Sequence, residues 1–264
     1  MSLPKPCASD LVCAVKSMSK TAQKALAEFI CIAPVDQRLN PAVLTSGSFK
    51  LELFDDAFFS QAAIHLPDTI SRASSKRKAE YFCGRYLAAL ALRHYGVEHF
   101  DVLADDKRCP QWPAGFVGSI SHTDDFAACA LAPSSELSAL GIDCQAILSS
   151  AKAEKLWPKI IDRDEFNIIA ASSFELNYGL SLCFSAKESI YKALYPFIRK
   201  FFGFSAAKLC AINPEQQYLE FDFSAERGKR IDIEHHLRAY YHVNSNRALS
   251  DVQLSPEQVY SQRS

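Results

Sequence analysis

Apolar residues recur at helical spacing in several stretches of the chain. This spacing predicts helices over residues 21–32, 72–95, 152–161 and 164–171, and a further helix that contains residues 184–192. The helix over 72–95 has the clearest ends, because Ser74 or Ser75 is a suitable N-cap and Gly96 follows the last apolar residue. It is therefore the best-defined element that we predict in the first half of the chain.

Other runs are continuously apolar or alternate apolar and polar residues, which predicts strands. These runs cover residues 49–54, 116–120, 127–131, 141–147, 219–223 and 230–234. The last two flank Gly228 and predict a β-hairpin. A polar connector over residues 133–138 separates two stretches that each hold helices and strands. We therefore predict an α+β fold of two similar halves, residues 1–138 and 139–264.

Composition narrows the class of protein. Of the 264 residues, 48% are hydrophobic and 22% are charged, and the formal net charge is −1, so no global field favours a nucleic acid or a membrane surface. The apolar run over residues 11–15 is too short for a signal peptide or a membrane span. Nine cysteines form no Cys-x-x-Cys pair, which favours a reducing, cytoplasmic compartment. We expect Cys31, Cys83, Cys129 and Cys183 to be buried.

The stretch Phe184-Ser-Ala-Lys-Glu-Ser-Ile-Tyr-Lys192 carries the strongest chemical signal. Glu188 and Lys192 are four residues apart, so they share one face of the predicted helix. Asp143 ends an apolar strand upstream, and carboxylates are preferred ligands of Mg²⁺. The alternative is that Asp143 caps a strand and that Glu188 and Lys192 form a surface ion pair. Phe184, one turn before Glu188, favours a partly buried face.

The chain has only nine glycines and no glycine-rich phosphate loop. Any phosphate would therefore be bound by side chains, and Arg77 and Arg85 lie roughly 80° apart on one predicted helix. The alternative is a solvated basic face. The acids in Ile231-Asp-Ile-Glu234 indicate plain amphipathic alternation, and His235 and His236 have no third ligand that would predict zinc. Further candidate phosphate ligands are Lys78, Lys107, Arg108 and His122.

Four blocks in order resemble the 4′-phosphopantetheinyl transferases, in the larger Sfp-type group and its enterobactin synthetase component D branch. Gly141-Ile-Asp-Cys-Gln145 resembles the strand motif of the family, and residues 184–192 fit its helix motif at every fixed position. Trp112-Pro113 with Gly118-Ser-Ile-Ser-His122, and the helix segment Arg77–Arg85, resemble two further family segments. The resemblance covers about two-thirds of the chain, from residue 72 to the predicted hairpin.

The resemblance implies two pseudo-symmetric α/β halves with antiparallel sheets, which would bind coenzyme A between them in one monomeric chain. It implies transfer of 4′-phosphopantetheine from coenzyme A to a serine of an acyl or peptidyl carrier protein, with Mg²⁺ required and 3′,5′-ADP released. Glu188 and Lys192 would be catalytic, and the metal would be held by Asp143, Glu188 and Gln145. The implied coenzyme A ligands are Arg77, Arg85, Lys107, Ser121, His122 and Lys192.

Gln145 departs from the family motif, which usually has Glu there. An amide oxygen can bind a metal or its water but brings no charge, so we expect weaker Mg²⁺ binding. One alternative is thus a non-catalytic module that binds coenzyme A or a carrier protein, and another is an unrelated Mg²⁺-dependent phosphotransferase. Residues 196–204, with Arg199 and Lys200, predict either a docking surface for an acidic carrier protein or a helix end packed on the core. The sequence does not specify the carrier.

Overall fold

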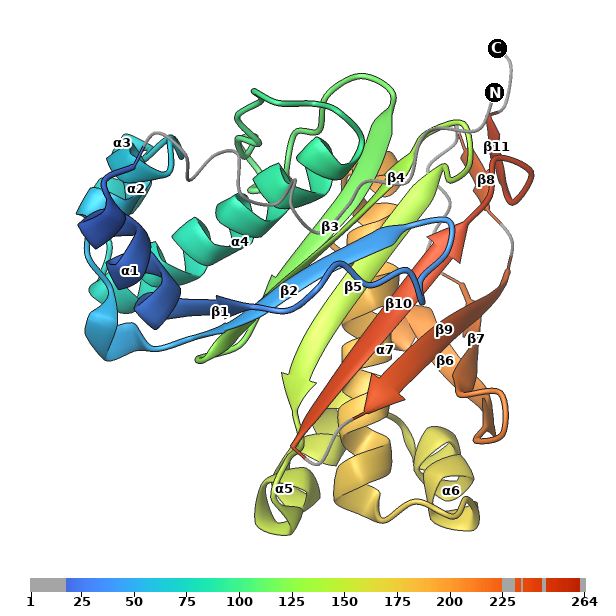
Figure 1. The fold of residues 1–264 in the computed structure, drawn as a ribbon. Coiled ribbons are helices and arrows are strands. Elements are labelled where there is room, and N and C mark those ends of the chain that lie inside the picture. The colour runs from blue at the N-terminus through green and yellow to red at the C-terminus, as the bar shows by residue number, and fades with distance from the viewer. Residues whose placement is uncertain (1–17, 225–230, 234, 244–245, 262–264) are drawn as a thin grey trace. The chain divides into compact units, whose positions relative to one another are not determined.

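The computed structural model describes residues 18–224, 231–233, 235–243 and 246–261. Contacts divide the chain into two compact units (Figure 1). The first unit comprises residues 1–116 and 120–131, and the second comprises residues 117–119 and 132–264. Each unit has its own hydrophobic core. The division at residues 138 and 139 stays a prediction.

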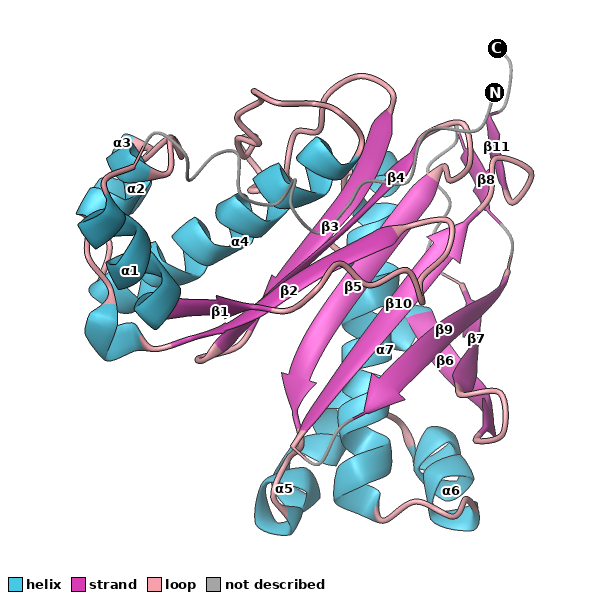
Figure 2. Ribbon diagram, in the orientation of Figure 1, coloured by secondary structure: helices cyan, strands magenta, loops and turns pink. Residues whose placement is uncertain are grey.

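The first unit packs a long helix on a four-stranded sheet with the order β1-β2-β4-β3 (Figure 2). Strand β1 pairs antiparallel with β2, and β2 pairs antiparallel with β4. Phe29, Phe82 and Leu87 are fully buried in its core. Its elements are α1 (Lys20–Phe29), β1 (Ile30–Ile32), β2 (Val43–Phe49), α2 (Ala57–Gln61), α3 (Asp68–Ser71), α4 (Ser75–His94), β3 (Phe116–His122) and β4 (Phe126–Pro133), with a short 3₁₀ helix over Leu51–Leu53.

Helix α4 begins and ends where the sequence predicts. The Ser74 side chain accepts a hydrogen bond from the backbone N–H of Arg77, and Gly96 follows the helix with φ of +79°. Gly84 allows the helix to approach β3 closely, because a Cβ atom there would lie 2.8 Å from Cγ2 of Ile120. The middle of α4 is thereby held close to β3.

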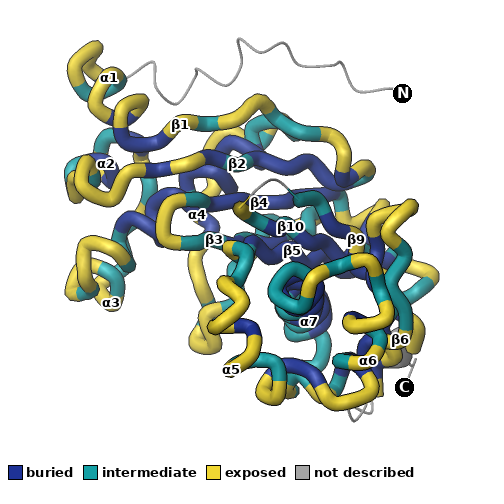
Figure 3. Tube along the Cα trace, turned by 90° about the horizontal axis from the view of Figure 1, so that it is seen from below, coloured by how far each residue is buried: buried dark blue, intermediate teal, exposed yellow. Residues whose placement is uncertain are grey.

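The second unit packs α7 on a five-stranded sheet with the order β5-β10-β9-β7-β6. Figure 3 shows the buried stretches that run along β5 and β10. All the sheet pairs of this unit are antiparallel, which confirms an α+β fold with antiparallel sheets. Its elements are β5 (Ala139–Ala146), α5 (Ser150–Ile160), α6 (Arg163–Ala171), α7 (Leu176–Ile198), β6 (Ala207–Asn213), β7 (Tyr218–Phe223), β8 (Ile231–Ile233), β9 (His236–Val243), β10 (Arg247–Leu254) and β11 (Val259–Ser261), with a short 3₁₀ helix over Phe204–Ala206.

Gly141 brings α7 into direct contact with β5. A Cβ atom at this position would lie 2.0 Å from the carbonyl oxygen of Ser189 and 2.6 Å from the backbone nitrogen of Ala193. Because side chains alternate along a strand, Asp143 and Gln145 share the face of Gly141 and therefore face α7. This close packing places the end of β5 beside the face of α7 that carries Glu188.

Five expectations from the sequence were wrong. The helix expected over residues 21–32 ends at Phe29, and residues 30–32 form β1. Asp143 does not end its strand, because β5 continues to Ala146. Residues 49–54 are not a strand, since β2 ends at Phe49 and the 3₁₀ turn follows. The predicted hairpin does not form: β7 pairs with β9, with Leu219 opposite Ala239, whereas β8 pairs with β11. Cys31 is exposed, because it lies on the outward face of the short edge strand β1. Cys83, Cys129 and Cys183 are buried as predicted.

Two further observations concern the remaining expectations. Residues 225–230 and 234 lie outside the described residues, so the alternation expected for Asp232 and Glu234 is not described. No helix within the described residues is both long enough and apolar enough to cross a membrane.

Candidate functional site in the second unit and the polar cluster of the first

Asp143 on β5 and Lys192 on α7 form an ion pair. The ammonium of Lys192 donates to Oδ1 of Asp143 at 2.8 Å and to the carbonyl oxygen of Ile142 at 3.0 Å. Asp143 is buried, so its charge is poorly screened by solvent. The two residues are 49 positions apart, and the packing of α7 on β5 brings them together.

Glu188 completes this group of charges. It lies one helical turn before Lys192 on the same face of α7 and is half-buried. Burial, and then the nearby Asp143 carboxylate, raise the pKa of Glu188, while Lys192 lowers it. A carboxylate whose pKa is raised toward neutrality is a better proton acceptor than a solvated one. The arrangement therefore places a half-buried carboxylate with a raised pKa beside a second carboxylate and a lysine.

The same residues fit a magnesium ion. Asp143 and Glu188 interact electrostatically, and Gln145 presents an amide on the same face of β5 as Asp143. The side-chain nitrogen of Gln145 donates a hydrogen bond to the carbonyl oxygen of Ala146. That bond does not use the side-chain oxygen, which is the atom that would bind a metal. Within the described residues no group of three or more His, Cys, Asp or Glu could hold a metal. Two carboxylates suffice for Mg²⁺, which completes its shell with water and phosphate oxygens.

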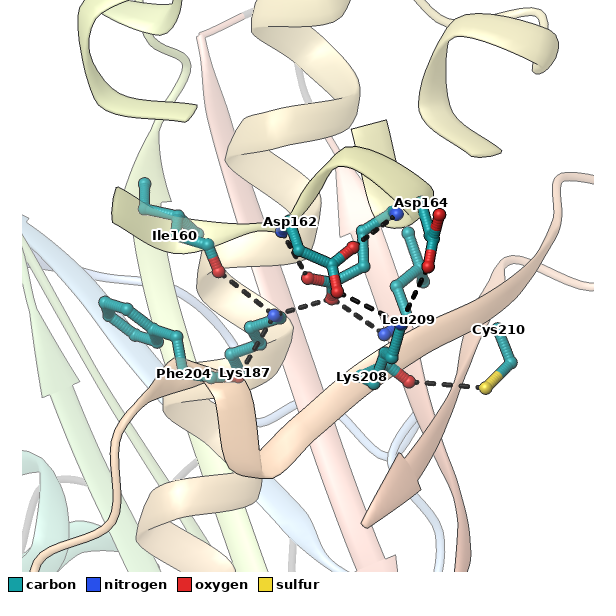
Figure 4. A network of polar contacts seen from close by, with 9 residues as sticks. Ile160, Asp162, Asp164, Lys187, Phe204, Lys208, Leu209 and Cys210 are labelled. Atoms are coloured by element: carbon teal, nitrogen blue, oxygen red, sulfur yellow. Dashed lines mark hydrogen bonds and ion pairs between the residues drawn. The ribbon is translucent and has the colours of Figure 1, made fainter. Parts of the chain in front are cut away.

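Lys187, which precedes Glu188, has a different environment, and our sequence interpretation gave it no role. Its ammonium pairs with Glu165 at 2.6 Å and donates to the carbonyl oxygens of Ile160 and Phe204 at 3.0 and 3.1 Å (Figure 4). Both side chains of the pair are at least 97% buried. Since the three ammonium protons have three acceptors here, Lys187 anchors α7 in the core. A helix turns about 100° per residue, which explains the different surroundings of Lys187 and Glu188.

A second polar cluster lies in the first unit, where α4 meets the end of β3. A guanidinium nitrogen of Arg77 is 3.2 Å from Nε2 of His122 and 3.4 Å from Oε2 of Glu80. Nδ1 of His122 lies 3.7 Å from the same Glu80 oxygen. Glu80 is buried, so it holds the Arg77 and His122 side chains in place. The sequence signal for Glu80 was its position one turn after Arg77, which we did not use.

The structure places the other predicted anion ligands as follows. The guanidinium of Arg85 stacks on Tyr81 at 4.7 Å, and its burial lowers the pKa of Arg85. Arg77 also acts on the Arg85 charge, so these two arginines are near each other as expected. Ser121 is buried and points to the opposite face of β3 from His122. Lys107 is 61% exposed and its ammonium lies 3.8 Å from Asp106.

Each unit thus carries its own polar cluster. In the second unit one face of α7 presents an acid and a lysine to Asp143 on β5, and in the first unit a buried glutamate contacts an arginine and a histidine. The sequence contains no glycine-rich phosphate loop. Side chains that could bind phosphate oxygens and a hard cation are thus the shared feature.

Comparison with known proteins agrees with the family resemblance of the sequence motifs. Residues 66–132 match the 4′-phosphopantetheinyl transferase N-terminal domain, and residues 139–250 match the 4′-phosphopantetheinyl transferase superfamily. The chain is 42% identical to enterobactin synthase component D of Salmonella typhi over 159 residues, which are 60% of this chain and 65% of that protein. It is 38% identical to enterobactin synthase component D of Salmonella austin over 176 residues, which are 64% of this chain and 72% of that protein.

A more distant relative extends this likeness. The chain is 30% identical to the 4′-phosphopantetheinyl transferase Svp of Streptomyces mobaraensis over 180 residues, which are 66% of this chain and 72% of that protein. The chain therefore belongs to the 4′-phosphopantetheinyl transferase family. The matched part spans 65% of the Salmonella typhi relative and 59% of the Salmonella typhimurium relative.

Proposed function

We propose that this protein transfers the 4′-phosphopantetheine group of coenzyme A to a serine hydroxyl of an apo acyl or peptidyl carrier domain. The observation that carries the proposal is the grouping of Asp143, Glu188 and Lys192 on the facing surfaces of β5 and α7. Family membership supplies the reaction class. The arrangement supplies a base, an anionic metal site and a cation for the transferring phosphate.

In the proposed reaction Glu188 accepts the proton of the carrier serine. The serine oxygen then forms a bond to the β-phosphorus of coenzyme A, the pyrophosphate P–O bond breaks, and 3′,5′-ADP leaves with the electron pair of that bond. Lys192 stabilises charge on the phosphoryl oxygens. In the metal-free protein, burial and the neighbouring Asp143 raise the pKa of Glu188.

Asp143 and Glu188, with Gln145 as a neutral third donor, would hold Mg²⁺. The ion would neutralise the pyrophosphate when bound. Arg77, Arg85 and His122, with Lys107 and Ser121, are the side chains that we assign to the remaining phosphate oxygens of coenzyme A. The contact of Arg77 with His122 and the buried Glu80 supports this assignment for the first pair.

Gln145 is the observation that favours a second candidate, a module that binds coenzyme A or a carrier without turnover. A neutral ligand in place of a carboxylate lowers the charge that holds Mg²⁺. The Asp143, Glu188 and Lys192 group retains its contacts, so we favour the enzyme. A module of this kind would bind coenzyme A tightly and modify no carrier.

We assign carrier docking to the exposed part of the segment after α7. Phe201 is 83% exposed, and Arg199 and Lys200 beside it are exposed as well. Phe201 contacts Tyr191, which lies on the Glu188 face of α7 one turn after that residue. Phe197 and Phe202 instead pack on the core, so the expected core role holds for those two residues. Basic residues around an apolar anchor suit an acidic carrier domain.

The experiment is intact-mass analysis of a panel of apo carrier domains incubated with coenzyme A, Mg²⁺ and the protein. We expect at least one carrier to gain the phosphopantetheine mass, and we expect Asp143→Ala and Glu188→Ala to abolish the gain. The panel also identifies the carrier. We further propose a monomer in the cytoplasm, in keeping with the lack of a Cys-x-x-Cys pair in the sequence.

A further inference from the structure

The site needs two carboxylates from different elements at a fixed separation. Asp143 is on β5, whereas Glu188 is on α7, and neither element sets the distance alone. Mg²⁺ requires near-octahedral geometry with ligand distances of about 2.0–2.1 Å, so an error of about half an ångström between the carboxylates weakens binding. Something must therefore fix α7 against the sheet at the level of these residues.

Three serines make that connection. The hydroxyl of Ser185 donates to the backbone carbonyl oxygen of Asp143 at 3.1 Å, and its oxygen lies 2.7 Å from the hydroxyl of Ser250. The hydroxyl of Ser189 donates to the carbonyl oxygen of Ser250 at 3.1 Å and lies 2.8 Å from its hydroxyl. Each of the three residues is fully buried. We call this group the serine network.

The serine network is adjacent to both proposed ligands. Ser185 lies one turn before Glu188, and Ser189 follows it directly, so both serines flank Glu188 along α7. Ser250 is directly opposite Asp143 in the pairing of β10 with β5. The network thus joins the backbone of the strand ligand to the helix of the other ligand.

Each of the three hydroxyl protons of the serine network has a hydrogen-bond acceptor. Ser185 and Ser189 use their protons on the carbonyl oxygens of Asp143 and Ser250. The proton of Ser250 then goes to one of the two helix hydroxyls, which lie 2.7 and 2.8 Å away. Buried polar groups of this kind fix one alignment of the elements that carry them, because a shifted alignment leaves donors unpaired.

We infer that the serine network is a positioning device that sets the separation of the Asp143 and Glu188 carboxylates for a divalent cation. Ser185, Ser189 and Ser250 are positioning residues, since their hydroxyls are used on one another and on the backbone carbonyl oxygens of Asp143 and Ser250. The inference rests on the proposed metal site. Gly141 contributes by allowing the close approach of α7 that these hydrogen bonds require.

Ser181 provides a matched control for substitutions in the serine network. Ser181 is one turn before Ser185 on α7 and is also fully buried. Its hydroxyl accepts from the backbone N–H of Leu148 at 2.9 Å and donates to the carbonyl oxygen of Asn177 at 2.6 Å. Replacing Ser181 therefore removes a buried hydroxyl of the same helix without touching the serine network.

The test measures Mn²⁺ affinity by electron paramagnetic resonance in the presence of coenzyme A, and thermal unfolding of the ligand-free proteins. We expect Ser250→Ala and Ser189→Ala to weaken Mn²⁺ binding about ten-fold, as loss of outer ligand supports does. Ser181→Ala should lower the unfolding temperature similarly and leave the Mn²⁺ affinity at the wild-type value. If Ser250→Ala does not fold, the Mn²⁺ affinity of Ser189→Ala still tests the inference.

Two results would overturn the inference. Wild-type Mn²⁺ affinity in both network variants would show that the separation of the carboxylates is set elsewhere. An equal loss of affinity in Ser181→Ala would show that general destabilisation is the cause. Failure of the wild-type protein itself to bind Mn²⁺ with coenzyme A overturns the metal site first, and the positioning role with it, so the two failures are distinguishable.

Discussion

The ammonium of Lys192 lies 2.8 Å from Oδ1 of Asp143, and Lys192 also lowers the pKa of Glu188. The positive charge of one lysine thus stabilises the ionised form of both carboxylates of the proposed site. Asp143 acts on Glu188 in the opposite direction, because like charges at short range disfavour ionisation. The basicity of Glu188 is a balance between these two neighbours and its burial.

Removal of the lysine should shift this balance. In Lys192→Met we expect the pKa of Glu188 to rise further, because the group that lowers it is gone. The measurement is an NMR titration of the Glu188 side-chain carboxyl in the metal-free proteins, because a bound cation would itself act on this carboxylate. We also expect a large loss of carrier modification at neutral pH. An unshifted Glu188 titration in the variant would contradict this electrostatic account.

Glu188→Gln should abolish transfer and stabilise the fold at neutral pH. A raised pKa means that ionised Glu188 opposes folding, and this opposition appears as pH rises through its folded-state pKa. We therefore expect the unfolding temperature of the variant to exceed that of wild type above neutral pH, with the difference closing in acid. Glu98→Gln, at an exposed position, is the control and should change neither quantity. A destabilised Glu188→Gln protein would argue against this electrostatic account.

Asp251 offers an independent pH test. It is buried on β10, and burial raises its pKa from 3.8 to about 6, with Gln253 donating to one of its oxygens at 2.9 Å. The stability that protonated Asp251 contributes is present below pH 4 and lost as pH rises through 6, which amounts to at most about 3 kcal/mol. Asp251→Asn should remove this slope from denaturant-unfolding free energies measured between pH 4 and 8. An unchanged slope would contradict the raised pKa.

Lys187→Met should destabilise the second unit without a direct effect on coenzyme A binding. Loss of one partner leaves Glu165 charged and buried, which costs about 3–5 kcal/mol. Lys208, whose exposed ammonium pairs with Asp162 and Asp164 at 3.0 Å, is the control, and Lys208→Met should unfold near the wild-type temperature. Thermal unfolding and the KM for coenzyme A below the transition separate the two roles. A raised KM with unchanged stability would make Lys187 a ligand-binding residue instead.

Gln145→Glu should lower the Mg²⁺ concentration needed for half-maximal rate, because it adds a third anionic oxygen on the face of β5 that carries Asp143. A titration of the initial rate with Mg²⁺ measures this. An unchanged Mg²⁺ dependence would remove Gln145 from the set of metal ligands.

The sequence predicted the parts of the site that depend on local spacing. Glu188 and Lys192 share a helix face because they are four residues apart, and Asp143 lies on a strand as its apolar run predicts, although that strand continues beyond it to Ala146. The register of distant strands has no such local signal. The pairing of β7 with β9 was missed, since Gly228 indicated a turn between strands that do not pair.

The supports of the site were missed for the same reason. Nothing near Ser250 in the sequence shows that it lies opposite Asp143, more than a hundred residues earlier in the chain. From the sequence, Lys187 is indistinguishable from a surface lysine. In the fold its ammonium contacts Glu165 and two backbone carbonyl oxygens. Such contacts depend on tertiary packing, whereas the ligands themselves are recognisable from their chemistry.

The most direct test of the central claim counts 3′,5′-ADP released per holo-carrier formed, by wild type and by Asp143→Asn at equal concentration. The account predicts one ADP for each carrier that gains phosphopantetheine with wild type, and neither product with Asp143→Asn. Equal product formation by the two proteins, or tight coenzyme A binding by wild type with no modified carrier across the panel, would contradict it.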